Sequence, residues 1–242
     1  MIAQVKSSNI KYLLLSLLLI SLFIPQDILG EDFDYKDEPE IALINDPLIS
    51  INKVIFQFND KVYLWFLKPV TKGYKFIVPE LIRVSVKNFF HNLLMPVRFL
   101  NCVLQGKALS AEAEFARFIV NITMGIGGFG DPAKKYAKLN PDSEDFGQTL
   151  GLYGIGNGFY LVLPFLGPSS LRDSFGYAFD SFLDPTGYAK TLSESSIVYS
   201  YRKLNDISFY MEDYESMREA AISPYEAFRD AYIQYRNKKI SK

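Results

Sequence analysis

Residues 46–69, DPLISINKVIFQFNDKVYLWFLKP, carry the clearest structural signal in this chain of 242 residues. Asp46-Pro47 is typical of a helix start, because aspartate can accept a hydrogen bond from the first turn and proline lacks an N–H that would go unused there. Apolar residues then recur at helical spacings of three and four along one line: Leu48, Ile51, Ile55, Phe58, Val62 and Trp65. We expect this line to pack as ordinary core and Pro69 to end the helix.

Further helix starts appear along the chain, separated by loops with glycine and proline. They are expected at Pro79-Glu80, Ser110, Ser170 and Ser223. The helix from Ser110 should have Glu112 and Glu114 in its first turn, where acidic side chains favour the macrodipole, and should run to Met124 before Gly125. The helix from Ser170 should stop at Asp184-Pro185, and the last one begins with the capping-box pattern Ser223-Pro224-Tyr225-Glu226.

Strand-type alternation is scarce, although Thr149–Tyr160 could hold a short hairpin across its glycines. An acidic, poorly patterned leader occupies residues 31–45, and no repeat or long linker divides the chain after residue 45. The sequence therefore predicts one all-α domain over residues 46–242, with at most one short hairpin.

The first 30 residues have the pattern of a secretory signal peptide. Lys6 and Lys11 precede an apolar run, residues 13–24, that is shorter than the roughly 20 residues of a spanning helix. Cleavage after Gly30 is the expectation, and an uncleaved anchor is the alternative. No cysteine follows the run to carry a lipid, so we expect the chain not to be lipidated and to be held at a membrane by its own apolar surface.

Composition argues against several classes of function. With a net charge of −1, the chain lacks the clustered positive charge that nucleic acid requires, so nucleic acid is not expected as a partner. His91 is the only histidine, which argues against a histidine-based metal site or a catalytic relay, and Cys102, the only cysteine, should be a small buried hydrophobe. We predict no enzyme activity, no metal and no cofactor.

Two acidic groups and one glycine-rich string have plain structural interpretations. The acidic groups, Asp142/Glu144/Asp145 and Glu212/Asp213/Glu215, are expected to be solvated. The string Gly125–Gly130 faintly resembles a dinucleotide fingerprint, but a helix precedes it and Asp131-Pro132 follows it. A flexible elbow that allows close approach of backbone is the better interpretation.

Residues 159–168, FYLVLPFLGP, form an apolar run that contains two prolines. The run is too short to span a bilayer and too rich in proline for a regular helix, and it suits a loop packed in a core or set at a lipid interface. Glycines at positions 147, 151, 154, 156 and 158 lie just before it. Together they indicate a shaped site.

The motifs of this chain, taken in order, resemble those of the MlaA/VacJ family. The first group is Asp46-Pro47-Leu48, Asn52-x-x-x-Phe56-x-Phe58-Asn59, Lys68-Pro69-Val70, Tyr74, Val78-Pro79 and Leu104-Gln105-Gly106. The second is Arg117-Phe118, Asn121, Gly125-x-Gly127-Gly128, Asp131, Asp145-Phe146-Gly147-Gln148-Thr149-Leu150-Gly151, Tyr160-Leu161-x-Leu163-Pro164-x-x-Gly167-Pro168-Ser169, Arg172-Asp173 and Asp184-Pro185. Ser223-Pro224-Tyr225, Arg229 and Tyr232 resemble the family's C-terminal element.

This resemblance implies a ring-like helical protein that lies in the inner leaflet of the outer membrane, on the periplasmic side, around a channel for lipid. Its function would be intermembrane phospholipid transport, in which phospholipid mislocalised to the outer leaflet is removed and lipid asymmetry is maintained. The implied partners are phospholipid, a trimeric porin of the outer membrane and a soluble periplasmic lipid carrier.

The candidate site residues derive from the motifs and from a second line on the first helix that mixes amides with rings. The lipid-channel candidates are Asn52, Phe56, Phe58, Asn59, Tyr63, Arg117 and Asn121. Arg117 either meets a headgroup phosphate or pairs internally with a carboxylate. The residues expected to gate or shape the opening are Gly125, Gly127, Gly128, Phe146, Gly147, Tyr160, Pro164, Gly167, Pro168, Arg172 and Asp173.

Some positions depart from the family pattern. The lipid-bearing cysteine is missing, Lys53 stands where arginine is usual, and Phe159 replaces a proline. The missing cysteine keeps open a second class of function, a soluble periplasmic protein that binds an apolar ligand and touches membrane transiently. A phospholipid hydrolase is a third, which the single His91 and the absence of a nucleophile elbow disfavour.

Overall fold

The computed structural model describes residues 44, 46–188 and 191–241. The predicted signal peptide and the acidic leader, apart from residue 44, lie outside the described residues. Within them the chain is helical with one two-stranded hairpin, so the predicted fold class is confirmed. No helix among the described residues is both long enough and apolar enough to cross a membrane.

The first helical rod is longer than the sequence indicates. It joins α2 (Ile49–Val62), the π-helical turn η1 (Tyr63–Leu67) and α3 (Lys68–Ile77) without a break, so the prediction that Pro69 ends the helix is wrong. In a regular α-helix the ring of Pro69 would clash with the carbonyl four residues earlier. The wider turn just before it, in which the Lys68 N–H bonds to the Tyr63 carbonyl, relieves that clash.

The start of α2 also differs from the prediction. The helix begins after Leu48, and no side chain caps its first turn, so the expected capping by Asp46 is wrong. The Asp46 carboxylate instead accepts hydrogen bonds from the Asn52 amide, at 2.8 Å, and from the Tyr225 hydroxyl. These partners come from the tertiary structure and outcompete a local cap.

The next four helices are α4 (Glu80–Leu93), α5 (Met95–Leu104), α6 (Ala108–Met124) and α7 (Pro132–Tyr136). The start of α4 and the end of α6 at Met124 confirm the predictions. However, α6 begins before Ser110, so neither Glu112 nor Glu114 lies in its first turn. Glu114 is instead buried and bonds to Arg98 of α5 through both carboxylate oxygens, at 2.9 and 2.8 Å.

The hairpin lies later in the chain than predicted. A capping box of Asp145 and Gln148 starts α8 (Phe146–Leu152), which takes the first residues of the expected hairpin, Thr149–Tyr160, into a helix. The strands are β1 (Tyr160–Leu163) and β2 (Gly167–Ser170), antiparallel, with Tyr160 opposite Ser170. The apolar run with two prolines is therefore the hairpin itself.

Four elements complete the chain: α9 (Leu171–Leu183), the 3₁₀ turn η2 (Pro185–Tyr188), α10 (Leu192–Ala220) and α11 (Pro224–Ile240). Ser170 caps α9 and Asp184 follows its last residue, as predicted. The start of α11 at Pro224 is also confirmed, but its capping box is not formed. Glu226 pairs with Lys53 of α2 at 2.7 Å instead.

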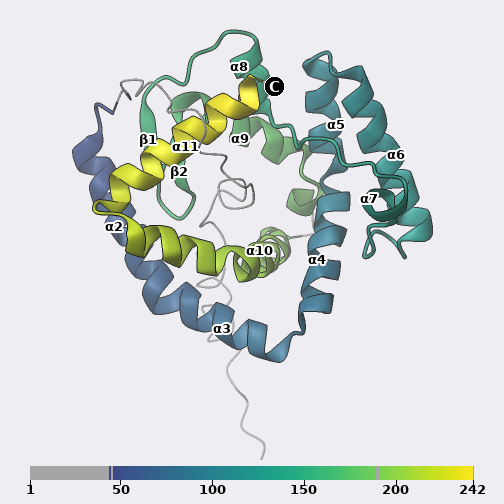
Figure 1. Ribbon diagram of the computed structural model, residues 1–242, viewed down its shortest axis with the longest axis horizontal. Helices are drawn as coiled ribbons and strands as arrows, with labels where there is room; N and C mark the ends of the chain where they lie inside the picture. The colour runs from purple at the N-terminus through teal and green to yellow at the C-terminus, as the bar shows by residue number, and fades with distance from the viewer. Residues whose placement is uncertain (1–43, 45, 189–190, 242) are drawn as a thin grey trace, which may run out of the picture.

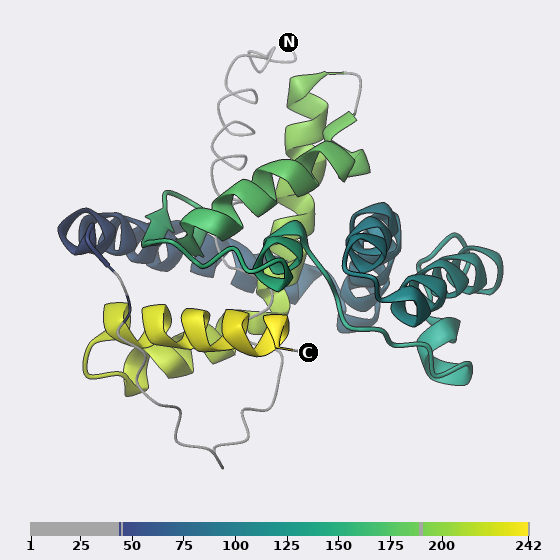
Figure 2. The same cartoon turned by 90° about the horizontal axis from the view of Figure 1, so that it is seen from above.

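The elements are arranged around a centre (Figure 1): α2 and α3 run along one edge, α4 to α7 along the next, and α8 and α9 lie on the far side. Figure 2 shows that α9 and the start of α10 lie on one side of the layer formed by α2 and α3, while α11 lies on the other. The long helix α10 connects the two sides. Two aromatic clusters hold it and α11 to the rod and to the hairpin.

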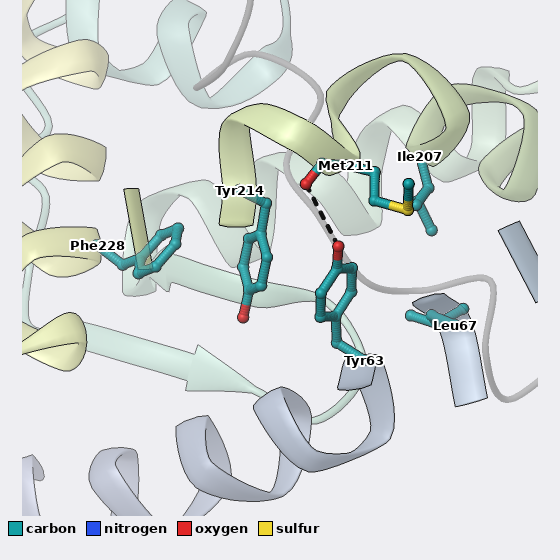
Figure 3. Close-up of a cluster of buried hydrophobic side chains, with 6 residues drawn as sticks. All are labelled: Tyr63, Leu67, Ile207, Met211, Tyr214 and Phe228. Carbon is teal, nitrogen blue, oxygen red and sulfur yellow. Dashed lines mark hydrogen bonds between the residues drawn. The ribbon is translucent and has the colours of Figure 1, made fainter. Parts of the chain in front are cut away.

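The first aromatic cluster joins η1 to α10 and α11, and its residues are Tyr63, Leu67, Ile207, Met211, Tyr214 and Phe228. Figure 3 shows the Tyr63 side chain pointing to α10, where its hydroxyl donates to the Met211 carbonyl at 3.3 Å. The second cluster joins the hairpin to α11, with residues Tyr160, Val162, Tyr225, Tyr232, Ile233 and Tyr235.

Candidate functional site

The face of the rod α2–η1–α3 that is buried most deeply is not the face that the sequence predicts. Three residues of the apolar line expected in the core face outward: Ile51 is 56% exposed, Phe58 is exposed, and Trp65 is 77% exposed. Ile55 and Val62 of the same line are half-buried and pack against the hydrophobic clusters, as predicted. The line of amides and rings faces inward, with Asn52, Asn59 and Tyr63 buried. The prediction that the apolar line is core is therefore wrong for Ile51, Phe58 and Trp65, because the innermost face of the rod supplies hydrogen-bonding groups to the hairpin.

Two asparagines on the same face of the rod hold the hairpin backbone. The Asn52 amide donates to the Tyr160 carbonyl at 3.1 Å and its oxygen accepts from the Val162 N–H at 2.9 Å. Asn59 makes the same pair of contacts further along, to the Leu163 carbonyl and the Phe165 N–H, both at 3.0 Å. A primary amide offers a donor and an acceptor side by side, as a neighbouring strand would. We call Asn52 and Asn59 the hairpin clamp.

The remaining residues of that line are packed in aromatic contacts. Phe56 lies edge-on to Tyr225, with ring centroids 5.7 Å apart. The single Tyr63 hydroxyl proton is shared between the Met211 carbonyl and the nearer Glu215 carboxylate, at 3.0 Å. Phe58 faces out and meets Phe165 of the hairpin turn edge-on at 5.2 Å. The polar atoms of the clamp are engaged by the hairpin backbone, so any effect of Asn52 and Asn59 on lipid acts through the position of the hairpin.

Large apolar side chains are also exposed outside the outward line of α2 and η1. They occupy α3, α4 and α9, and they include Phe76, Ile77, Leu81, Ile82, Phe175 and Phe182. Isolated exposed apolar residues are common on proteins, but many large ones on several helices indicate contact with protein or lipid. We call the outward line of the rod and these side chains the apolar rim.

Arg117 and Asn121 bind Asp131, which supports the internal pairing of Arg117 over contact with a phosphate. Arg117 bonds to one oxygen of the Asp131 carboxylate and to Asn140, and Asn121 donates to the other oxygen at 3.0 Å. The Asn121 oxygen also accepts from the Ala133 N–H. These contacts hold α7 against α6.

The glycine elbow between α6 and α7 contains very close backbone approaches, as expected. A Cβ on Gly125 would lie 2.4 Å from the Asn121 carbonyl, and one on Gly128 would lie 2.7 Å from the Asn92 amide. Gly127 and Gly128 both have positive φ, and so does Ile126 between the glycines. The close approach of backbone is thus confirmed at Gly125 and Gly128, and the φ of Gly127 and Gly128 favours glycine; the flexibility of the elbow stays a prediction.

Arg172 and Asp173 belong to a buried ionic network between α8, α9 and α11. Arg236 of α11 bonds to Asp173 at 3.0 Å and to both carboxylate oxygens of Asp145, and Tyr232 donates to Asp173 at 2.6 Å. Burial alone would raise the pKa of Asp173, but Arg236 and Arg172 beside it bring the pKa below its usual value. Asp145 is thus engaged, and Glu144 is buried with Lys107 at 2.8 Å. The prediction that this acidic group is solvated is wrong for both residues.

Gly147 and Phe146 bring α8 against α9. A Cβ on Gly176 of α9 would lie 2.4 Å from the Gly147 nitrogen, so the two backbones nearly touch. Phe146 stacks on Phe179 at 3.9 Å between centroids, and its N–H donates to Asp180. Burial raises the pKa of Asp180 to about 7. These residues form a tight joint between α8 and α9.

The other predicted shaping residues lie in the hairpin. Tyr160 is buried against Tyr225 and Tyr232, Pro164 is exposed in the turn, and Pro168 pairs with Val162. Gly167 has a φ of +81°, which lets the chain re-enter the sheet after the turn. The structure therefore gathers the hairpin residues, the clamp and the ionic network into one region, while Arg117, Asn121 and the elbow lie elsewhere.

Three polar groups were not identified from the sequence: the buried Arg98–Glu114 pair, the half-buried Asp180 and the buried Arg236. Each of these four is a polar residue in a helix, and only the partner brought in by the fold distinguishes it from a solvated one. Cys102 is fully buried, as predicted, and burial raises its pKa to about 11. Among the described residues no group of three or more potential ligands could hold a metal ion.

Comparison with known proteins identifies the family to which the chain belongs. The family model for "MlaA lipoprotein" matches residues 44–239, which include the rod, the hairpin and α11. The chain belongs to the MlaA lipoprotein family. This membership confirms the predicted resemblance and the prediction that the chain is not an enzyme.

Relatives and a solved structure agree with the family. The "Intermembrane phospholipid transport system lipoprotein MlaA" of Haemophilus influenzae is 31% identical, over 82% of this chain and 80% of that protein. An "Uncharacterized protein" of Rickettsia bellii is 32% identical, over 94% and 92%. A solved MlaA-family structure, described as "Structural basis for maintenance of bacterial outer membrane lipid asymmetry", superposes with a TM-score of 0.71 at 29% identity, over 81% of this chain and 98% of the other.

Proposed function

We propose that this chain transports phospholipid at the outer membrane, embedded in one leaflet by its apolar rim. The observation that carries the proposal is the outward apolar line of the rod, with Trp65 exposed on one face and the clamp buried on the other. No described helix spans a membrane, so such a surface fits a protein that lies within one leaflet. The MlaA relatives named for intermembrane phospholipid transport support the substrate class.

The finer proposal is that the chain, exported by its signal peptide, removes mislocalised phospholipid from the outer leaflet and passes it to a soluble periplasmic carrier. It would act beside a trimeric outer-membrane porin, as the family resemblance implies. The hairpin, held by Asn52 and Asn59 and joined to α9 by the Asp173 N–H donating to Ser170, is the element we assign to shaping the lipid path.

Membrane extraction tests the embedding. The double variant Phe58→Asp/Trp65→Asp places two carboxylates on the apolar line, and Gln57→Asp/Gln234→Asp adds the same charge at exposed polar positions. After an alkaline carbonate wash, wild type and the glutamine control should stay with the membranes, and the Phe58/Trp65 variant should be released. Full release of wild type would contradict the embedding and favour the soluble apolar-ligand-binding protein.

Lipid labelling in cells tests the transport. A membrane-impermeant amine reagent labels phosphatidylethanolamine that has reached the outer leaflet of intact cells. Cells without the chain should show more labelling, wild type and the glutamine control should restore the low level, and the Phe58→Asp/Trp65→Asp variant should not. Unchanged labelling on deletion would contradict the proposed transport even if the chain is embedded.

A further inference from the structure

One exposed corner of the molecule combines an apolar face with an unbalanced positive charge. On α6, Phe115, Ile119 and Ile122 are spaced by four and three residues, so they share one helix face, and all three are exposed. The face continues into the elbow, where Ile126 is 85% exposed. Both views place α6 and α7 at the outer edge of the molecule (Figures 1 and 2).

Three exposed lysines lie on α7 or just after it: Lys134, Lys135 and Lys138. Tyr136 between them is 71% exposed, and the Lys135 ammonium lies 5.0 Å from the centre of its ring. From Phe115 to Pro141 the only acidic residue is Asp131. Its carboxylate is already engaged by Arg117 and Asn121, so the three ammonium groups have no acidic neighbour in this segment.

The positive charge also affects a histidine of the neighbouring helix α4. The pKa of His91 on α4 is lowered well below its usual value, first by burial and then by four cations: Arg98, Arg117, Lys87 and Lys134. Lys134 is therefore near enough to His91 to affect its protonation, while Arg98 and Arg117 are themselves paired with Glu114 and Asp131. The exposed lysines of the corner attract anions.

We propose that this corner, residues 115–138, binds an anionic phospholipid surface. The apolar face of α6 and the elbow enters the acyl region, and Lys134, Lys135 and Lys138 meet headgroup phosphates. An amphipathic ring such as Tyr136 belongs at that boundary, and lysines next to apolar side chains keep their charge in the headgroup layer. The corner then sets the depth and tilt at which the molecule lies, a role that rests on the proposed function and adds an orientation to it.

Fluorescence quenching by brominated lipid tests the insertion separately from the proposed function. Trp65 is the only tryptophan, so wild type reports on the apolar rim. The variants Trp65→Phe/Tyr136→Trp and Trp65→Phe/Ile122→Trp report on the corner, and Trp65→Phe/Gln234→Trp is an exposed control on α11. Each full-length protein is reconstituted into vesicles of phosphatidylcholine and phosphatidylglycerol brominated at shallow or deep acyl positions.

The tryptophan at position 136 should be quenched most by shallow bromine, that at position 122 by deeper bromine, and that at position 234 little by either. If Trp65 is quenched while positions 122 and 136 behave like position 234, the embedding holds and the corner does not bind lipid. That result would overturn the inference and would favour contact of the corner with a protein partner. If Trp65 is also unquenched, the proposed function fails as well.

Lysine removal tests the charge. Lys134→Gln/Lys135→Gln is matched with Lys61→Gln/Lys72→Gln, which removes two exposed lysines from the rod. At low salt the corner variant should lose binding to vesicles containing phosphatidylglycerol by about fivefold per lysine, and high salt should remove the difference. Binding to pure phosphatidylcholine should change little. Equal losses for the two pairs would overturn the assignment of the charge to this corner.

Discussion

Replacing Asn52 by alanine is expected to release one end of the hairpin. The change removes the donor to the Tyr160 carbonyl and the acceptor for the Val162 N–H, and it leaves both backbone groups without these partners. Tyr160 and Val162 are 1% and 2% exposed, so solvent reaches neither group easily. The same change removes the Asn52 donor to Asp46.

The magnitude can be worked from these contacts. A buried polar group left without a partner costs about 1–3 kcal/mol. Two such groups, partly relieved by water entering the vacated space, give a loss of about 3 kcal/mol in the free energy of unfolding. That is a large part of the roughly 5–15 kcal/mol that stabilises a typical domain. Asn52→Asp should cost at least as much, because it turns the donor into an acceptor that faces the Tyr160 carbonyl and the Asp46 carboxylate.

Urea unfolding in mild detergent, monitored by the helical circular dichroism signal, measures the loss. The midpoint should fall while the slope with urea stays unchanged, and Gln57→Ala on the exposed face of the same helix should change the free energy by no more than about 0.5 kcal/mol. Asn59→Ala loosens the same hairpin, so its effect combined with Asn52→Ala should be less than additive. If Asn52→Ala and Asn52→Asp both unfold within about 0.5 kcal/mol of wild type, the hairpin is held by other contacts and the reasoning fails.

Three further changes test the buried polar contacts and the close helix approach. Glu114→Gln should lower the free energy of unfolding by about 3–5 kcal/mol in urea titrations, because it leaves a buried arginine without its carboxylate, whereas exposed Glu112→Gln should have almost no effect. The raised pKa of Asp180, about 7 against an ordinary 3.8, means that the folded state holds a proton that the unfolded chain loses, so the stability of wild type falls as pH rises from 3.8 to about 7. The Asp180→Asn variant lacks this titration, so its free energy of unfolding should rise relative to that of wild type by about 2–3 kcal/mol as the pH increases from about 5 to about 8. A difference that does not change with pH would contradict the assignment of the raised pKa to Asp180. Gly176→Ala should lower the melting temperature because its Cβ would meet the α8 backbone at 2.4 Å, while Gly73→Ala, with no atom within 4 Å, should raise it slightly; equal effects would argue against the close approach.

Local signals predicted the elements well where the chain supplies its own partners. Ser170 caps α9 with its own side chain, the starts at Glu80 and Pro224 coincide with a proline at the terminus, and α6 ends at Met124 just before Gly125. Each signal lies within a residue or two of the terminus that it marks. Pro69 shows the limit of such signals. Its effect on the helix depends on whether the preceding turn can widen, and the packing of Tyr63 and Leu67 against α10 holds that turn in place.

The sequence indicated some residues of the candidate site but not the partners that they contact. Asn52 and Asn59 stood out as amides among rings, but their partner is a hairpin about a hundred residues later, and no local pattern reveals it. Arg236 was missed because its two aspartates come from α8 and α9.

The sequence by itself determined the helical class, the helix termini at Glu80, Met124, Ser170, Asp184 and Pro224, and the family, because these depend on local spacing and on ordered motifs. Only the tertiary structure decided which face of the rod is inside. Periodicity shows that a helix has two different faces, and the apolar face is normally the buried one. Here the hairpin backbone needs the donors and acceptors of Asn52 and Asn59, so the polar face turns inward and Ile51, Phe58 and Trp65 turn out.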